Sequence, residues 1–150
     1  MAEFRAAQAA DVGAIVVIDP QGPGRREEIR ALVRERASLV AVEHGQIVGF
    51  LGIRSGHFYH RDFVDLLFVA PPWQRQGLAR LLMRTALGHA STSRVFTSTN
   101  QSNGPMRELL RSEGWTASGV LSGLDDGDPE HVFFHDAVPL RSAAGTVTSG

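Results

Sequence analysis

The chain has 150 residues, of which 43% are hydrophobic and 21% are charged, and its formal net charge at pH 7 is −1. A chain of this size can bury one core, and it lacks the basic excess expected of a protein that binds nucleic acid or an anionic membrane. The absence of cysteine and lysine excludes thiolate chemistry, Walker-type phosphate loops and Schiff-base chemistry.

The first half of the chain predicts two helices and four strands. Residues 3–8 predict a strand, and a short helix follows from Asp11, whose carboxylate can cap the first turn. Residues 26–37 predict an amphipathic helix, because apolar residues recur on one face. Residues 38–54 hold two runs rich in valine and isoleucine around a His-Gly turn, which is typical of a hairpin. Residues 63–69 are almost continuously apolar, so we expect a central strand covered on both faces.

The second half predicts two more helices and three strands. A helix is expected at residues 78–90, a strand at 94–99 and a helix at 103–114, where Pro105 and Gly114 mark the two ends. The apolar face of the first of these helices comprises Leu78, Leu81, Leu82 and Ala86. Strands are expected at residues 115–121 and 131–136. This order predicts an α/β fold with about seven strands and about four helices.

The sequence also predicts the organisation of the chain and its compartment. We expect one domain over residues 1–140 and a flexible, functionally silent tail over residues 141–150, which is small, polar and aperiodic. Neither a signal peptide nor a membrane-spanning stretch is found. We therefore expect a cytoplasmic protein with no membrane or nucleic-acid partner.

Residues 69–79, with the sequence VAPPWQRQGLA, predict an anion site. Pro71 and Pro72 end the preceding strand, and Gly77 leads directly into a helix. The first N–H groups of a helix have no internal partner and lie at the positive end of its dipole, and a glycine allows a ligand to approach the backbone. A glycine needed only for the geometry of the turn is the alternative.

The same run matches the pattern V-x-P-x-aromatic-[Q/R]-x-x-G-x-[G/A] and resembles the acetyl-CoA motif of the GNAT N-acetyltransferase superfamily. The resemblance implies a single GNAT-like domain with a mixed, splayed sheet, and acetyl-CoA as the cosubstrate. It implies that backbone amides near Gly77 hold the coenzyme A diphosphate, and that Phe68 and Val69 pair with the pantetheine arm. The cofactor-binding residues are then Phe68, Val69, Gln74, Arg75, Gln76, Gly77, Leu78, Ala79, Arg80 and Asn103.

The resemblance extends to residues 103–115, where Asn103, Leu109, Gly114 and Trp115 match the family's spacing. It implies that Asn103 contacts the cofactor arm, although helix capping is an equal alternative. Where the family often has a tyrosine that protonates the departing thiolate, this chain has Leu110. A thiol pKa near 8.5 allows the thiolate to leave without help, so no general acid is assigned.

Acetyl transfer requires a neutral amine, and a carboxylate or histidine can remove its proton, directly or through water. Asp65 is the first candidate because it lies in an apolar strand, with a structural ion pair as the alternative. His57 and Tyr59, in the connection at residues 54–62, are candidates for substrate binding or proton relay, and surface polarity is their alternative. No metal-ligand spacing and no G-x-S-x-G elbow occur, so we expect no metal.

The predicted function is direct transfer of the acetyl group from acetyl-CoA to a primary amine, in a complex that contains both substrates. The acceptor is a small molecule or a peptide, and the acidic loop with Asp125, Asp126, Asp128 and Glu130 either attracts a cationic amine or is a solvated turn. A non-catalytic acyl-CoA-binding sensor, suggested by Leu110, and a cofactor-free interaction protein are the alternatives. Because folds of the resembling family often dimerise, a homodimer stays possible.

Overall fold

The computed structural model describes residues 1–137, so the predicted tail lies outside the described residues. The chain divides into two compact units. The N-terminal unit contains Met1–Arg54 and Asp65–Ala86, and the C-terminal unit contains Ser55–Val64 and the residues from Leu87 onward. No helix in residues 1–137 combines the length and apolar character needed to cross a membrane.

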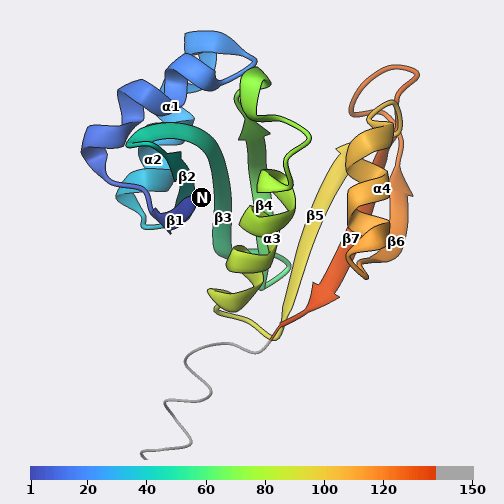
Figure 1. The fold of residues 1–150 in the computed structure, drawn as a ribbon. Helices are drawn as coiled ribbons and strands as arrows, with labels where there is room; N and C mark the ends of the chain where they lie inside the picture. Colours follow the sequence, from blue (N-terminus) through green and yellow to red (C-terminus); the bar gives the residue numbers. More distant parts are fainter. Residues whose placement is uncertain (138–150) are drawn as a thin grey trace, which may run out of the picture. The chain divides into compact units, whose positions relative to one another are not determined.

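Seven strands and four α-helices make up the described fold, as predicted (Figure 1). The strands are β1 (Glu3–Ala6), β2 (Ser38–Glu43), β3 (Gln46–Phe58), β4 (Arg61–Val69), β5 (Arg94–Asn100), β6 (Thr116–Leu121) and β7 (Glu130–Asp136). The helices are α1 (Val12–Ile18), α2 (Arg26–Arg34), α3 (Leu78–Gly88) and α4 (Gly104–Ser112). The sheet has the order β1-β2-β3-β4-β5-β7-β6, in which β4 and β5 are parallel while β1–β2, β2–β3, β5–β7 and β6–β7 are antiparallel. The predicted mixed α/β sheet and the central place of β4 are therefore confirmed.

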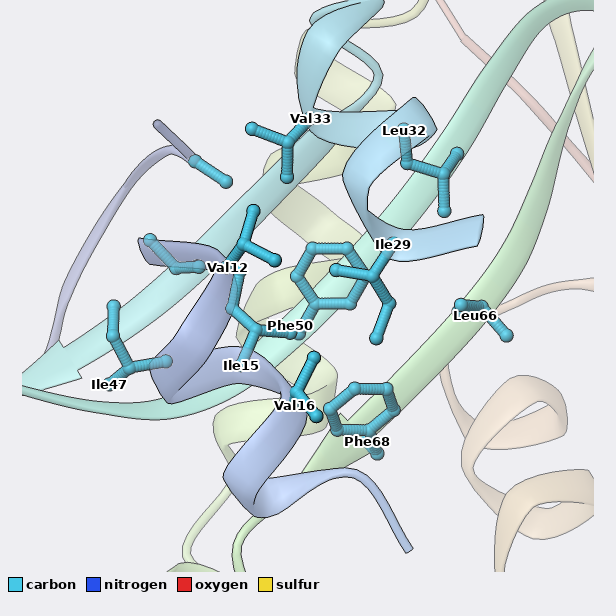
Figure 2. Packing of buried hydrophobic residues seen from close by; sticks show 12 residues of the cluster. Val12, Ile15, Val16, Ile29, Leu32, Val33, Ile47, Phe50, Leu66 and Phe68 are labelled. Carbon is cyan, nitrogen blue, oxygen red and sulfur yellow. The ribbon is translucent and has the colours of Figure 1, made fainter. Parts of the chain in front are cut away.

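The core of the N-terminal unit forms where α1 and α2 pack on the strands (Figure 2). Helix α2 buries Ile29, Leu32 and Val33, which are spaced to lie on one face, while its charged residues remain exposed. Figure 2 shows these side chains in one cluster with those of α1, Phe50 of β3 and Phe68 of β4. The buried face of α2 thus fixes the helix pair on the strands, including β4, which leads to the predicted anion site.

Three local expectations differ from the structure. The Asp11 carboxylate accepts hydrogen bonds from the Gln8 N–H and from Arg5, so it stabilises the turn before α1 and does not cap α1 itself. Burial along β4 alternates, because residues 62, 64, 66 and 68 are buried and the residues between them are only partly covered. Helix α3 buries Met83, whereas Leu81 is 39% exposed.

The connection between β3 and β4 is much shorter than the predicted loop at residues 54–62. Strand β3 continues to Phe58 and β4 begins at Arg61, which leaves a two-residue turn. Tyr59 and His60 adopt φ values of 49° and 68°, as a tight hairpin turn of this length requires. The sequence lacks the Asn-Gly signal for such a turn, so the strands were predicted too short.

The C-terminal unit contains β5, β6, β7 and α4, with α4 beside β6 (Figure 1). A row of rings crosses its strands, and the centroids of Phe58 and Phe96 lie 5.1 Å apart and those of Phe96 and Phe134 5.6 Å apart. Leu110 is the buried residue of α4 and Trp115 follows the helix, also buried. The burial of Leu110 and Trp115 stabilises the position of α4 within the unit.

Candidate functional site: a helix start built to bind an anion

The turn from β4 to α3 is shaped by two prolines and two left-handed residues. Residues 71–73 form a single 3-10 turn, closed by a hydrogen bond of 2.8 Å from the Trp73 N–H to the Ala70 carbonyl. Arg75 and Gly77 then adopt φ values of 63° and 81°. A Cβ on Gly77 would have no atom within 4 Å, so the left-handed backbone conformation, and not crowding by the protein, favours glycine there.

The backbone donors at the start of α3 point to an anion. The first hydrogen bond that closes the helix runs from the Leu81 N–H to the Gly77 carbonyl, at 3.0 Å. Within residues 1–137, the N–H groups of residues 76–79 have no hydrogen-bond acceptor. Residues 74–77 are exposed, so a ligand can reach the turn. Donors at the positive end of a helix dipole form an anion site.

The side chains of this turn hold its shape. The Gln74 side chain donates to the Val69 carbonyl at 2.9 Å, and Gln76 donates to the Pro72 carbonyl at 3.4 Å. Gln74, predicted to bind cofactor, therefore fixes the end of β4 through its side-chain nitrogen. Arg75 is exposed beside the same backbone donors. The binding capacity of the turn thus rests mainly on its backbone N–H groups.

Strand β4 leaves one edge without a strand partner near this turn. The ladder between β4 and β5 joins Asp62–Val64 to Val95–Thr97, and in the described chain no pair of this ladder involves residues 65–69. The Phe68 ring packs into the core against Phe50, with centroids 5.5 Å apart. The backbone of Phe68 and Val69 is therefore the part of these residues that a ligand can use.

Asp65, the predicted base, is held by an arginine. Arg54 Nε donates to Asp65 Oδ2 at 2.5 Å, and Arg54 Nη1 lies 3.4 Å from a carboxylate oxygen of Glu35. This geometry fits the structural alternative, while the second oxygen of Asp65 keeps its capacity to accept a proton or a water hydrogen bond. The catalytic role of Asp65 stays a prediction.

Asp62 was not singled out from the sequence, and it is the more deeply buried aspartate of β4, with 2% exposure. Its Oδ1 accepts from the Gly56 N–H at 3.0 Å and the Ser91 hydroxyl at 2.8 Å, and its Oδ2 accepts from the Ser91 N–H at 2.7 Å. Asp62 therefore ties the end of β3 to the segment after α3 within the C-terminal unit. In the sequence, Asp62 could have been recognised as a charged residue at the start of an apolar run.

A second missed carboxylate, Asp19, lies after α1. Its side chain is fully buried and accepts from Arg25 Nη2 at 2.6 Å, Arg25 Nε at 3.0 Å and the Gln21 N–H at 2.8 Å. Burial opposes ionisation most strongly, but the hydrogen bonds from Arg25 and Gln21 outweigh it and place the pKa of Asp19 below its ordinary value. Arg25 Cζ also lies 5.6 Å from the centroid of the Phe68 ring. Asp19 thus holds a cation against β4, and the Asp-Pro turn was its signal in the sequence.

Three further predicted residues, His57, Tyr59 and Asn103, belong to the C-terminal unit. His57 lies near the end of β3, and Tyr59 lies in the hairpin turn, 84% exposed and edge-on to Phe58. Asn103 Oδ1 accepts from the Met106 N–H at 3.2 Å, so the capping role is confirmed and the cofactor role stays a prediction. Leu110 is fully buried.

Two carboxylates of the acidic loop accept hydrogen bonds from residues outside the loop. The Asp128 carboxylate accepts from the Ser102 N–H and hydroxyl at 2.9 and 2.6 Å, and Asp125 accepts from Asn100 at 2.9 Å. The hydrogen bonds from Ser102 lower the pKa of Asp128. Asp126 remains exposed in the same loop. In the described chain, no group of three or more His, Asp or Glu is arranged to hold a metal ion.

Comparisons with known proteins agree with the described fold. The profile of the family described as "Acetyltransferase (GNAT) family" matches residues 9–115. A crystal structure of a GNAT-family acetyltransferase from Bacillus cereus is 32% identical, with a TM-score of 0.88 over 92% of this chain and 99% of that chain.

Two more distant structures share the fold. A GNAT-family acetyltransferase structure from Desulfovibrio desulfuricans is 18% identical, with a TM-score of 0.75 over 92% of this chain and 100% of that chain. The ribosomal-protein-S18-alanine N-acetyltransferase from Escherichia coli is 16% identical, with a TM-score of 0.74 over 91% of this chain and 94% of that chain. The search of curated proteins found no match.

Proposed function

Because the chain belongs to the GNAT family of acetyl-CoA-dependent N-acetyltransferases, we propose that it transfers the acetyl group directly to a primary amine, with the coenzyme A diphosphate at the start of α3. The observation that supports this site is the set of unpartnered N–H groups at residues 76–79, seen within the described chain. A diphosphate offers several acceptor oxygens and a negative charge, which matches these donors and the helix dipole.

Acetyl-CoA brings an activated thioester, and the residues of the chain position it. The turn at residues 74–80 holds the anionic part of the cosubstrate, and the backbone of Phe68 and Val69 pairs with its amide-containing arm, as a strand added to an edge. This pairing uses the edge of β4 beyond Val64 that has no ladder partner in the described chain.

The amine must lose a proton before it attacks, because an alkylamine of pKa about 10.4 is mostly protonated at neutral pH. We assign this step to Asp65, which acts through a water on the oxygen that Arg54 does not hold. Leu110 has no proton to give, so the thiolate departs as the anion. His57 and Tyr59 stay candidates for binding the acceptor, and Asn103 for contact with the cofactor arm.

Isothermal titration with coenzyme A, together with thiol release from acetyl-CoA and a panel of amines, tests the proposal. The panel contains a polyamine, an aminoglycoside, an amino acid and a peptide with a free N-terminus. The perturbing variant is Gly77→Asp, which places a carboxylate beside the donors while aspartate tolerates the left-handed conformation better than most residues. We expect coenzyme A affinity to fall by at least about tenfold.

Gly123→Asp is the matched control, because Gly123 also has a positive φ, of 94°, and a Cβ there would have no atom within 4 Å. It should lose a similar amount of stability and keep coenzyme A affinity. Equal affinities in the two variants would show that the start of α3 is not the diphosphate site. Coenzyme A binding without turnover on every amine would instead favour the non-catalytic acyl-CoA-binding module.

A further inference from the structure

The N-terminal unit contains a cavity lined by arginines, and none of its lining residues belongs to the turn at residues 74–80. The cavity, of about 630 Å³, is bordered by the segment before α1, the first turn of α1 and the polar face of α2. This volume falls within the range of about 300–1,000 Å³ that small-molecule sites occupy. The chain as a whole carries a net charge of −1, yet the lining contains four arginines and no acidic residue.

Three of these arginines form a column on α2. Arg26, Arg30 and Arg34 are spaced four residues apart, so they lie on the same face of the helix. Like charges at this spacing repel one another and destabilise the helix. Arg30 is paired with Glu27, at 2.7 Å, but the pair is exposed and therefore weak. The column carries a repulsion that an anionic ligand would relieve.

In the described part of the chain, the three arginines of the cavity other than Arg30 have no partner in the protein. Within residues 1–137, Arg26, Arg34 and Arg36 make no ion pair or side-chain hydrogen bond. Arg36 follows α2 in a left-handed conformation, with φ of 58°, which turns the chain back after the helix. Guanidinium groups bind phosphate oxygens through two parallel N–H donors, which makes arginine the preferred cation for phosphate.

Small and apolar residues also line the cavity. Val12 and Val33 line the cavity and belong to the hydrophobic cluster drawn in Figure 2, so this side is held by the core. Gly13, in the first turn of α1, also lines the cavity, and a Cβ there would have no atom within 4 Å. The cavity therefore combines apolar residues that belong to the core with a group of arginines.

We propose that this cavity is a binding site for a small molecule that carries a chain of phosphate groups, held by Arg26, Arg30, Arg34 and Arg36. A chain of phosphates matches a column of cations better than a single phosphate does, because successive guanidinium groups can each hold a different phosphate. The ligand is distinct from the cosubstrate that we propose for the start of α3.

Titration with inorganic tripolyphosphate tests the site, with the full chain saturated with coenzyme A so that the α3 site is filled. Arg30→Gln/Arg34→Gln removes two neighbouring cations of the column, and we expect affinity for tripolyphosphate to fall by about tenfold or more. Arg107→Gln/Arg111→Gln is the matched control, because it removes an equally spaced pair from α4. The control should retain the affinity of the parent chain.

Gly13→Glu is an independent test that removes no arginine. It adds a carboxylate at a position with open space, and an acidic residue in the first turn of a helix favours folding. It should weaken tripolyphosphate binding, whereas Gly13→Ala should not. The proposal is overturned if tripolyphosphate does not bind at low salt, if the α2 and α4 double variants lose affinity equally, or if citrate binds as tightly as tripolyphosphate.

Discussion

Replacing Asp65 by asparagine separates its catalytic role from its structural role. Asparagine keeps the shape of the side chain and a carbonyl oxygen that can accept from Arg54, but it cannot take a proton from the amine. If Asp65 is the base, kcat at saturating amine should fall by about 10²–10⁴-fold. The companion variant Arg54→Gln breaks the same ion pair and leaves the carboxylate in place.

The structure limits how much either change affects stability. The side chains of Arg54 and Asp65 are 22% and 20% exposed, and their ion pair is closed by one short hydrogen bond. A partly exposed pair of this kind contributes about 1 kcal/mol, so each variant should lower the melting temperature by about 2–4 °C. A loss of 10²–10⁴ in kcat corresponds to about 3–5 kcal/mol in the barrier, which is well above that effect.

Steady-state thiol release and thermal denaturation, measured on the same preparations, provide the comparison. The base assignment requires a large loss of kcat in Asp65→Asn and a much smaller one in Arg54→Gln, at similar melting temperatures. Equal losses of kcat in the two variants would refute it and leave Asp65 as a structural partner of the arginine. A pH profile of kcat/KM that keeps its acidic limb in Asp65→Asn would refute it as well.

Three further predictions concern the other carboxylates. Asp62→Asn should lower the free energy of unfolding by about 2–4 kcal/mol and the melting temperature by about 4–16 °C. The reason is that the carboxylate of Asp62 accepts three hydrogen bonds in a buried place, whereas asparagine would turn an NH₂ group towards one of these donors. The pKa of Asp19 is lowered in the folded state, so its pairing with Arg25 stabilises the fold above a carboxyl pKa of about 3.9 and is lost as the pH falls through the lower folded value. Urea denaturation of Asp19→Asn should show a lower free energy of unfolding at pH 7 than the parent chain, and a smaller loss of this free energy as the pH falls. Asp128→Ala should lower the melting temperature more than Asp126→Ala, while Asp126→Ala should raise the KM for a polyamine acceptor if the loop attracts cations.

The turn with unpartnered backbone donors at the start of α3 could be predicted from the sequence, because all of its parts lie within a short segment. The prolines that end β4, the glycine with positive φ and the start of α3 follow one another within residues 69–79. Each acts through a local backbone rule, so no knowledge of tertiary contacts was needed. The left-handed Arg75 was not predictable in this way, since a non-glycine residue adopts that conformation only where its surroundings enforce it.

The partners of the carboxylates could not be predicted, because they depend on how distant segments meet. Arg54 lies eleven residues before Asp65, and a two-residue turn at Tyr59 and His60 brings their strands together as a hairpin. The sequence predicted a longer connection there, which left Asp65 without an obvious partner. Ser91, which holds Asp62, comes from a segment beyond α3. A polar residue in an apolar strand signals a required partner, but it does not identify that partner.

The absence of lysine bears directly on how the activity can be measured. All 15 basic residues of the chain other than histidine are arginines, and a guanidinium group stays protonated at any pH used for the assay, so it does not act as an acyl acceptor. An acetyltransferase normally presents lysine amines that can themselves accept acetyl groups from its cosubstrate. This chain has no such side chain, so thiol released in proportion to an added amine reports transfer to that amine and not modification of lysines on the enzyme.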